Sequence, residues 1–82
     1  MRLQGEKALK ESLVVKSLKG HDLGRVYLVV ATVSEDFVLL VDGEYRKLDN
    51  PKQKRRKHIE EIAKVQIPEL LTDSEIRKIC KI

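Results

Sequence analysis

The strongest structural signals of this chain lie in residues Leu13–Gly43, LVVKSLKGHDLGRVYLVVATVSEDFVLLVDG. Val26–Val33 is β-branched and apolar at both odd and even positions, which is typical of a strand covered on both faces. Asp36–Val41 repeats this pattern after a short turn at Ser34-Glu35. These two runs predict two buried neighbouring strands.

A tight turn precedes the first of these strands. Leu13–Leu18 is a short β-rich run, and Lys19–Arg25 follows it directly. Gly20 and Gly24 provide positive φ and allow close backbone approach, while Asp22 can hydrogen-bond neighbouring amides. The pattern therefore predicts two strands joined by a glycine turn.

A second turn lies at Asp42-Gly43. This dipeptide is a strong signal for a two-residue hairpin, because both positions of a type I′ turn need positive φ. Glu44–Leu48 is then expected to return as a further, more polar strand. Asn50-Pro51 interrupts the ladder and begins a basic segment, which is expected to be a loop.

The segment His58–Val65 is compatible with two structures. Ile59, Ile62 and Ala63 fit the apolar stripe of a helix. Ile59 could equally begin a strand that closes the sheet. Periodicity alone leaves both alternatives open.

The last element has clearer signals. Thr72 is an N-cap residue with Glu75 three positions on, and Leu71 and Ile76 occupy the positions of a hydrophobic staple. These residues predict a short helix over Asp73–Lys81. Its apolar stripe contains Ile76, Ile79 and Cys80, so the cysteine is expected to be packed rather than reactive.

The chain of 82 residues is long enough for one small domain. Four short strands, with a possible fifth, cannot bury both faces of a flat sheet, and curling into a small, partly open barrel removes most of the edge problem. We therefore expect a mainly β fold with a short C-terminal helix. The expected parts are an arm over 1–12, the barrel over 13–65, and a tail containing the helix over 66–82.

Several function classes lack the residues they need. Cys80 is the single cysteine, so no intrachain disulfide forms, and the start of the chain is too polar for a signal peptide. The apolar run Val26–Val33 is too short to cross a bilayer. His21 and His58 lack ligand partners, and no nucleophile–base arrangement or phosphate-binding Gly-Lys-Ser/Thr motif is present. We expect a cytoplasmic, monomeric non-enzyme without metal, cofactor or membrane contact.

The positive charge is concentrated in one segment. The formal net charge is only +4, but seven of the 17 Lys and Arg lie between Arg46 and His58, opposed by Asp49 alone. These cations are Arg46, Lys47, Lys52, Lys54, Arg55, Arg56 and Lys57. Such crowding favours an anionic partner, which would relieve repulsion and release counterions. A solvated loop and a nuclear-localisation signal are the alternative interpretations.

The ordered series of features resembles a known family. Leu13–Arg25, followed by the apolar strand Val26–Val33, resembles the KOW motif of small bacterial KOW-domain RNA-binding proteins. These are similar to the KOW module of the archaeal and eukaryotic large-subunit ribosomal protein numbered fourteen. The similarity continues through Phe37–Gly43 and the basic segment to Glu60. Residues before Leu13 and after Val65 are not covered.

The resemblance implies an SH3-like barrel of the KOW type that binds RNA, with ribosomal RNA, the ribosome or ribosomal proteins as partners. It also implies that the chain after His58 begins as the closing strand. In this family the motif's turn and the strands beside it commonly meet RNA. The residues expected to contact RNA are Lys19, Gly20, Gly24, Arg25, Tyr45, Arg46, Lys47, Lys52, Lys54, Arg55, Arg56 and Lys57.

The scarcity of aromatic residues bears on how RNA would be contacted. Lys19 and Arg25 flank a turn whose backbone amides could receive a phosphate. Of the three aromatic residues only Tyr45 lies near the basic segment, whereas Tyr27 and Phe37 are expected in the core. We therefore expect contacts to the RNA backbone with little base reading.

A protein-interaction module is the alternative function. SH3-like barrels also dock proteins of the transcription- and translation-factor type. Such a module would use an apolar or acidic surface, for example the helix face of Ile76 and Ile79.

Overall fold

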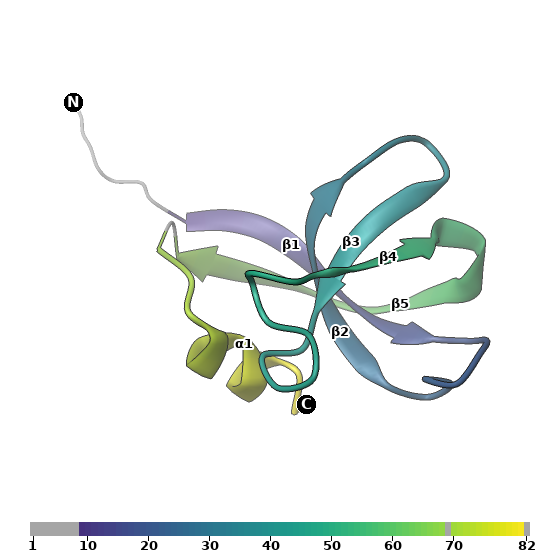
Figure 1. Cartoon of the computed structure of the whole chain (residues 1–82). Helices are drawn as coiled ribbons and strands as arrows, with labels where there is room; N and C mark the ends of the chain where they lie inside the picture. Colours follow the sequence, from purple (N-terminus) through teal and green to yellow (C-terminus); the bar gives the residue numbers. More distant parts are fainter. Residues whose placement is uncertain (1–8, 69, 82) are drawn as a thin grey trace.

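The structure, a computed structural model, describes residues 9–68 and 70–81. The described chain folds into one sheet with a helix packed against it (Figure 1). Its elements are β1 (Leu9–Ser17), β2 (Val26–Thr32), β3 (Phe37–Val41), β4 (Lys52–Arg55), the 3₁₀ turn η1 (Arg56–His58), β5 (Ile59–Pro68) and α1 (Asp73–Ile79). The mainly β class and the C-terminal helix are as predicted.

The five strands form one antiparallel sheet in the order β4-β3-β2-β1-β5. Strands β1 to β4 pair with their neighbours in sequence, and β5 returns to the free edge of β1. The sheet therefore has β4 and β5 as its two edges, and no ladder between them closes it within the described residues.

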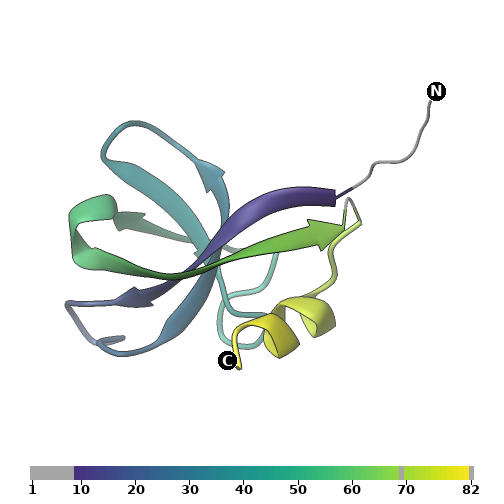
Figure 2. The ribbon, with the colours of Figure 1, turned by 180° about the vertical axis from the view of Figure 1, so that it is seen from behind.

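The two edges are nevertheless close together at one end. Only Arg56–His58 separates the end of β4 from the start of β5. Four steps of extended chain span at most about 14 Å, whereas the outer strands of a flat five-stranded sheet lie about 19 Å apart. The sheet must therefore curl, as Figures 1 and 2 show. Register shifts add local bending, with an extra residue in β5 opposite Val14/Val15 and another in β2 between Val29 and Ala31.

Side chains alternate between two apolar clusters, one on each face of the sheet. On the face covered by α1, Val14 packs with Leu28, Val41 and Ile76. The cluster on the other face is formed by Val15, Tyr27, Val38 and Leu40, with Ile59 of β5 packed against it. We call this second cluster, on the face of the sheet away from α1, the inner core. The prediction of Tyr27 as a core residue is confirmed.

Strand β1 begins earlier than expected. Leu9–Ser12 pairs with β5 opposite Val65–Pro68, so the predicted loose arm is wrong for these four residues. The remainder of that arm, residues 1–8, lies outside the described residues. The alternative of a helix over His58–Val65 is also wrong, since Ile59 begins the long strand β5. The strand implied by the family resemblance is confirmed.

The region after β3 differs most from the prediction. Glu44–Leu48 is not a strand, and Asp42-Gly43 is not a two-residue hairpin, because β3 and β4 are joined by the longer connection 42–51. The Asp42 carboxylate accepts hydrogen bonds from the amides of Glu44 and Arg46 and turns the chain away from the ladder. The expected basic loop instead forms β4 over Lys52–Arg55.

Helix α1 carries the predicted capping box, in which Thr72 Oγ1 accepts from the Glu75 amide and the Glu75 carboxylate accepts from the Thr72 amide. It ends at Ile79, two residues before the predicted end. Ile76 is fully buried and Ile79 is half-buried against the same cluster. The helix face suggested above as a protein-docking surface is therefore part of the core, and that prediction is wrong.

Cys80 packs against the same cluster, and burial raises the pKa of its thiol to about 11, so the packed role predicted for it is confirmed. No helix within residues 9–68 and 70–81 has the length and apolar character needed to span a membrane.

Candidate nucleic-acid interface

The glycine turn and the β4–β5 turn lie at the same end of the molecule and contact each other (Figures 1 and 2). The Leu18 amide donates to the His58 carbonyl over 2.8 Å. The Lys54 ammonium donates to the Lys19 carbonyl over 2.7 Å. We call this region, formed by residues 18–25 and 55–58, the loop end. The fold thus places the glycine turn beside the last part of the basic segment.

The glycine turn is closed by its own backbone. Gly20 and Gly24 have φ of 92° and 87°, the positive values expected from the sequence. The amides of Leu23, Gly24 and Arg25 donate to the carbonyls of Gly20, Ser17 and Asp22. These three amides are therefore not free to receive a phosphate, and anion contacts at this turn depend mainly on side chains.

Asp22 lies at the centre of a buried polar network. Ser17 Oγ donates to its carboxylate over 2.8 Å and the Tyr27 hydroxyl over 2.9 Å. The ammonium groups of Lys52 and Lys54 each lie 3.0 Å from it. Burial by itself raises the pKa of Asp22, but the hydrogen bonds from these four side chains outweigh it and hold the pKa far below its usual value. Asp22 is thus ionised and pins the glycine turn to β4.

Lys52 and Lys54, two of the residues predicted to contact RNA, pair with Asp22 in this network instead. Lys52 and Lys54 lie on the same face of β4, where they pair with Leu40 and Val38 of the inner core. Their side chains are only 28% and 10% exposed, because the stems cover the core while the ammonium groups reach Asp22. Lys52 and Lys54 are two positions apart, a spacing that places both side chains on one face of a strand. The sequence predicted a loop for this segment, so this signal was not used.

Besides Arg25, the loop end has four further cations, and all of them point outward. Lys19, Arg55, Arg56 and Lys57 are all exposed. Partial burial and the charges of Lys19, Lys57, Lys54 and Arg55 lower the pKa of His58 below its usual value of 6.5. The four cations that contribute to this lowering surround His58 at this point of the surface.

The two arginines of this group have partners that orient them. The Arg55 guanidinium lies over the Phe37 ring, with Cζ 4.9 Å from its centroid. Arg56 donates to Thr32 Oγ1 over 3.3 Å. Both contacts tie the basic side chains to the neighbouring strands and leave their outer edges open to solvent.

The remaining predicted site residues form a separate group in and around the connection 42–51. Arg25 stacks on Tyr45, whereas Arg46 is half-buried and accepts hydrogen bonds at its carbonyl from the amides of Asp42 and Gly43. Lys47 is exposed. The connection 42–51 ends where β4 begins, whereas Arg55 is the last residue of β4. Arg25, which belongs to the loop end, joins the two groups through its contact with Tyr45.

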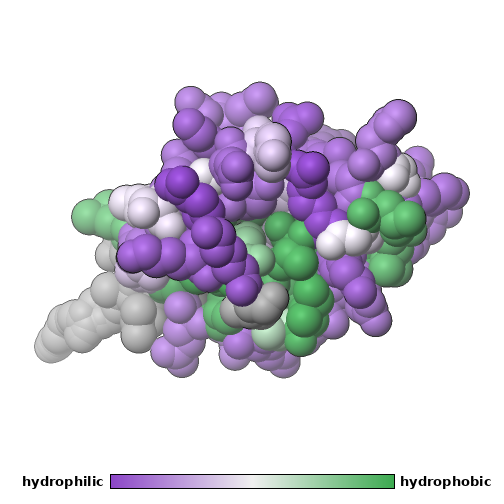
Figure 3. All heavy atoms as spheres, turned by 90° about the horizontal axis from the view of Figure 1, so that it is seen from below, coloured by the Kyte–Doolittle hydropathy of each residue, from purple (hydrophilic) through white to green (hydrophobic). Residues whose placement is uncertain are grey.

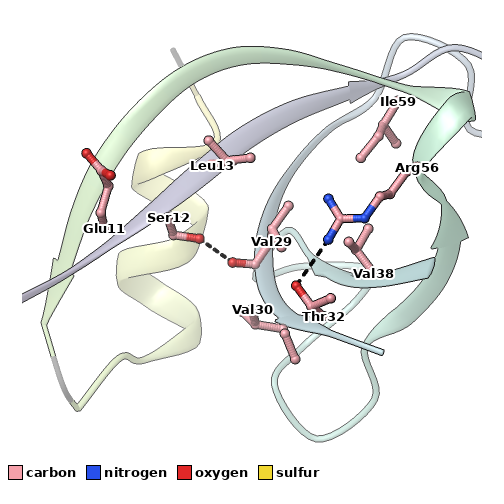
Figure 4. A pocket seen from close by; sticks show the side chains of 10 residues that line it. Glu11, Ser12, Leu13, Val29, Val30, Thr32, Val38, Arg56 and Ile59 are labelled. Carbon is pink, nitrogen blue, oxygen red and sulfur yellow. Dashed lines mark hydrogen bonds between the residues drawn. The ribbon is translucent and has the colours of Figure 1, made fainter. Parts of the chain in front are cut away.

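A groove of about 350 Å³ opens beside Arg56 (Figure 4). It forms where β1 and β2 separate beyond the Val14–Leu28 pair, and Ser12 Oγ bridges the gap to the Val29 carbonyl. Its floor belongs to the inner core, and it is lined by Leu13, Val29, Val38 and Ile59. The groove is thus the open mouth of the curled sheet.

No group of three or more His, Cys, Asp or Glu side chains within the described ranges is arranged to hold a metal ion. No protein-family model matches the chain, and a comparison with curated proteins found no match either.

Proposed function

We propose that this chain is a non-catalytic RNA-binding domain, an SH3-like barrel of the KOW type that contacts structured RNA through the phosphate backbone. The barrel type is supported by the curl that brings β4 and β5 together and by the resemblance of Leu13–Glu60 to KOW modules. The same resemblance makes ribosomal RNA the first RNA to test and a cytoplasmic, ribosome-associated role the expected one.

The outward cations of the loop end are the observation that carries the proposal. The negative charge of Asp22 is paired with the ammonium groups of Lys52 and Lys54, so it does not offset the exposed cations of this surface. Arg55, Arg56 and Lys57 line one shallow hollow together with Asp36, so three cations face one carboxylate there. Such an excess on an ordered turn suits the regularly spaced phosphates of a folded RNA.

A salt titration of RNA binding tests this proposal. Fluorescence anisotropy of a labelled ribosomal RNA hairpin would be measured between 50 and 200 mM KCl, a range roughly wide enough to resolve the slope. The double variant Arg55→Gln/Lys57→Gln should bind less tightly and lower the slope of log K against log salt by about one for each phosphate that it no longer neutralises. Lys52 and Lys54 are left intact because their removal would disturb the fold.

The matched control removes the same charge elsewhere. Lys64 and Lys78 are exposed on β5 and α1, away from the loop end. The Lys64→Gln/Lys78→Gln variant should keep the affinity within about twofold and retain the slope. Equal behaviour of the two double variants would contradict the proposed interface. Crosslinking of the tagged protein in cells, followed by sequencing of the recovered RNA, would identify the RNA.

A further inference from the structure

Tyr45 is the most exposed aromatic residue of the protein and lies on a fixed loop. It is 68% exposed, whereas Tyr27 is buried and Phe37 half-buried. The Asp42 carboxylate accepts from the amide of Glu44 over 2.9 Å and from that of Arg46 over 2.8 Å, on either side of Tyr45. The ring is therefore held out in solvent by an ordered backbone.

Arg25 covers one face of this ring. Its Cζ lies 4.2 Å from the centroid of Tyr45. The Arg25 amide donates to the Asp22 carbonyl and its carbonyl accepts from the Ser17 amide, both over 2.9 Å, so the backbone of Arg25 is also fixed. Because the ring remains mostly exposed, its second face is open. Aromatic rings and guanidinium planes are the surfaces on which unstacked RNA bases stack.

A hollow of about 260 Å³ lies beside the stacked pair, between the start of β2 and the last turn of α1. Val26 and Cys80 give it apolar walls, and Arg77 and Lys81 add two cations. Figure 3 views the molecule from this side and shows apolar side chains near the middle of the face, bordered by hydrophilic ones. An apolar wall with cations at its edge suits a base and its phosphate.

Two carboxylates also line the hollow. Asp42 is engaged by the loop amides of Glu44 and Arg46. Glu44 is exposed and can accept a hydrogen bond from the exocyclic amino group of a base. The phosphate would therefore lie on the side of Arg77 and Lys81, away from Glu44.

We infer that this hollow receives a single unstacked nucleotide of a folded RNA. The base stacks on the open face of Tyr45, and the phosphate lies beside Arg77 and Lys81. This inference rests on the proposed function and extends the RNA-contacting surface from the loop end to α1. It also gives the domain a means of preferring RNA with a bulged nucleotide over a continuous duplex.

A pair of RNA hairpins tests the inference. One hairpin carries a single bulged 2-aminopurine in its stem, and the other has the same stem fully paired. Wild type should quench the 2-aminopurine fluorescence and bind the bulged hairpin more tightly. Tyr45→Leu should lose the quenching and roughly 5- to 100-fold in affinity for the bulged hairpin alone, the range expected for one base–aromatic stack. Tyr45→Phe, which keeps the ring, should retain both.

Separate variants distinguish the outcomes. Arg77→Gln/Lys81→Gln should weaken binding of the bulged hairpin more than that of the paired one. If Tyr45→Leu binds both hairpins like wild type while Arg55→Gln/Lys57→Gln is impaired, the inference is wrong and the proposed function stands. If Arg55→Gln/Lys57→Gln leaves affinity and salt slope unchanged for both hairpins, the proposed function itself fails. Unchanged thermal unfolding of the Tyr45 variants, as expected for an exposed residue, confirms that they fold.

Discussion

At the scale of single residues, Asp22 explains why the basic segment is not uniformly a binding surface. Its carboxylate receives two lysine ammonium groups and two hydroxyls, and the residue is only 7% exposed. A buried carboxylate is tolerated only when its charge is paired and its lone pairs are occupied. Lys52 and Lys54 therefore stabilise the fold, and RNA contact is left to the exposed cations.

The acid dependence of stability should report this network. The pKa of Asp22 is lower in the folded than in the unfolded chain, so its contribution is present above the unfolded value of about 3.9 and is lost as the pH falls below it. Asp22→Asn should cost about 3–5 kcal/mol at pH 7, because the two partly buried lysines lose their counter-charge. The difference from wild type should shrink at pH 3, as measured by urea unfolding.

Asp49→Asn is the control for this prediction, since Asp49 is exposed in the connection 42–51. It should change stability by less than about 0.5 kcal/mol at either pH. A loss for Asp22→Asn that is equally large at pH 3 and pH 7 would show that the charge of Asp22 is not what stabilises the turn.

Sequence reasoning reached the glycine turn but not this network. Gly20, Gly24 and Asp22 lie close together in the chain, and their backbone preferences identify a turn without further context. Lys54 is 32 positions from Asp22, and their contact depends on the pairing of β3 with β4. No local pattern encodes that register, so the sequence showed the charges without showing which of them face inward.

At the scale of elements, the same distinction between local and long-range signals holds. Strands β2 and β3 and the cap of α1 were predicted nearly residue for residue, because their signals are apolar runs and an N-cap within a few positions. Strand β4 was missed because Asp42-Gly43 is a hairpin signal, and the carboxylate of Asp42 instead stabilises a longer connection. The alternatives for the segment after His58 were decided by pairing with β1.

The meeting of the connection 42–51 with α1 allows a direct test of element packing. Gly43 has φ of 81°, and a Cβ on it would lie 2.3 Å from the Asp73 carbonyl oxygen and 2.7 Å from the Arg77 amide nitrogen. Gly43→Ala should therefore cost more than about 3 kcal/mol, since both backbones would have to move apart. Urea unfolding measures the loss.

Gly24→Ala is the matched control. Gly24 has a similar φ of 87°, but a Cβ on it would meet no atom within 4 Å. It should cost only the backbone penalty of about 1–2 kcal/mol. The difference between the two variants isolates the contact between the loop and the helix, and equal losses would mean that α1 does not pack closely on Gly43.

At the scale of the whole molecule, one sheet serves two cores. Val14 faces the cluster under α1, whereas its neighbour Val15 faces the inner core beneath the glycine turn. The two clusters share every central strand, so neither can melt without breaking the backbone ladders of the other. The helix is therefore part of the framework that holds the loop end, although it lies on the opposite face of the sheet.

Ile76→Ala should accordingly weaken the entire fold. Ile76 is fully buried, and loss of three methyl and methylene groups from such a site costs about 2–5 kcal/mol, a large share of the roughly 4–12 kcal/mol expected for a domain of this size. In a Tyr45→Phe background Tyr27 is the remaining tyrosine and reports on the inner core. The unfolding transitions followed by its fluorescence and by far-UV circular dichroism should shift together to lower urea concentration.

Ile62→Ala is the control, at a site 45% exposed on β5. It should change the free energy of unfolding given by either probe by no more than about 1 kcal/mol. If Ile76→Ala shifts the circular dichroism transition but leaves the Tyr27 fluorescence transition unchanged, the two cores unfold independently.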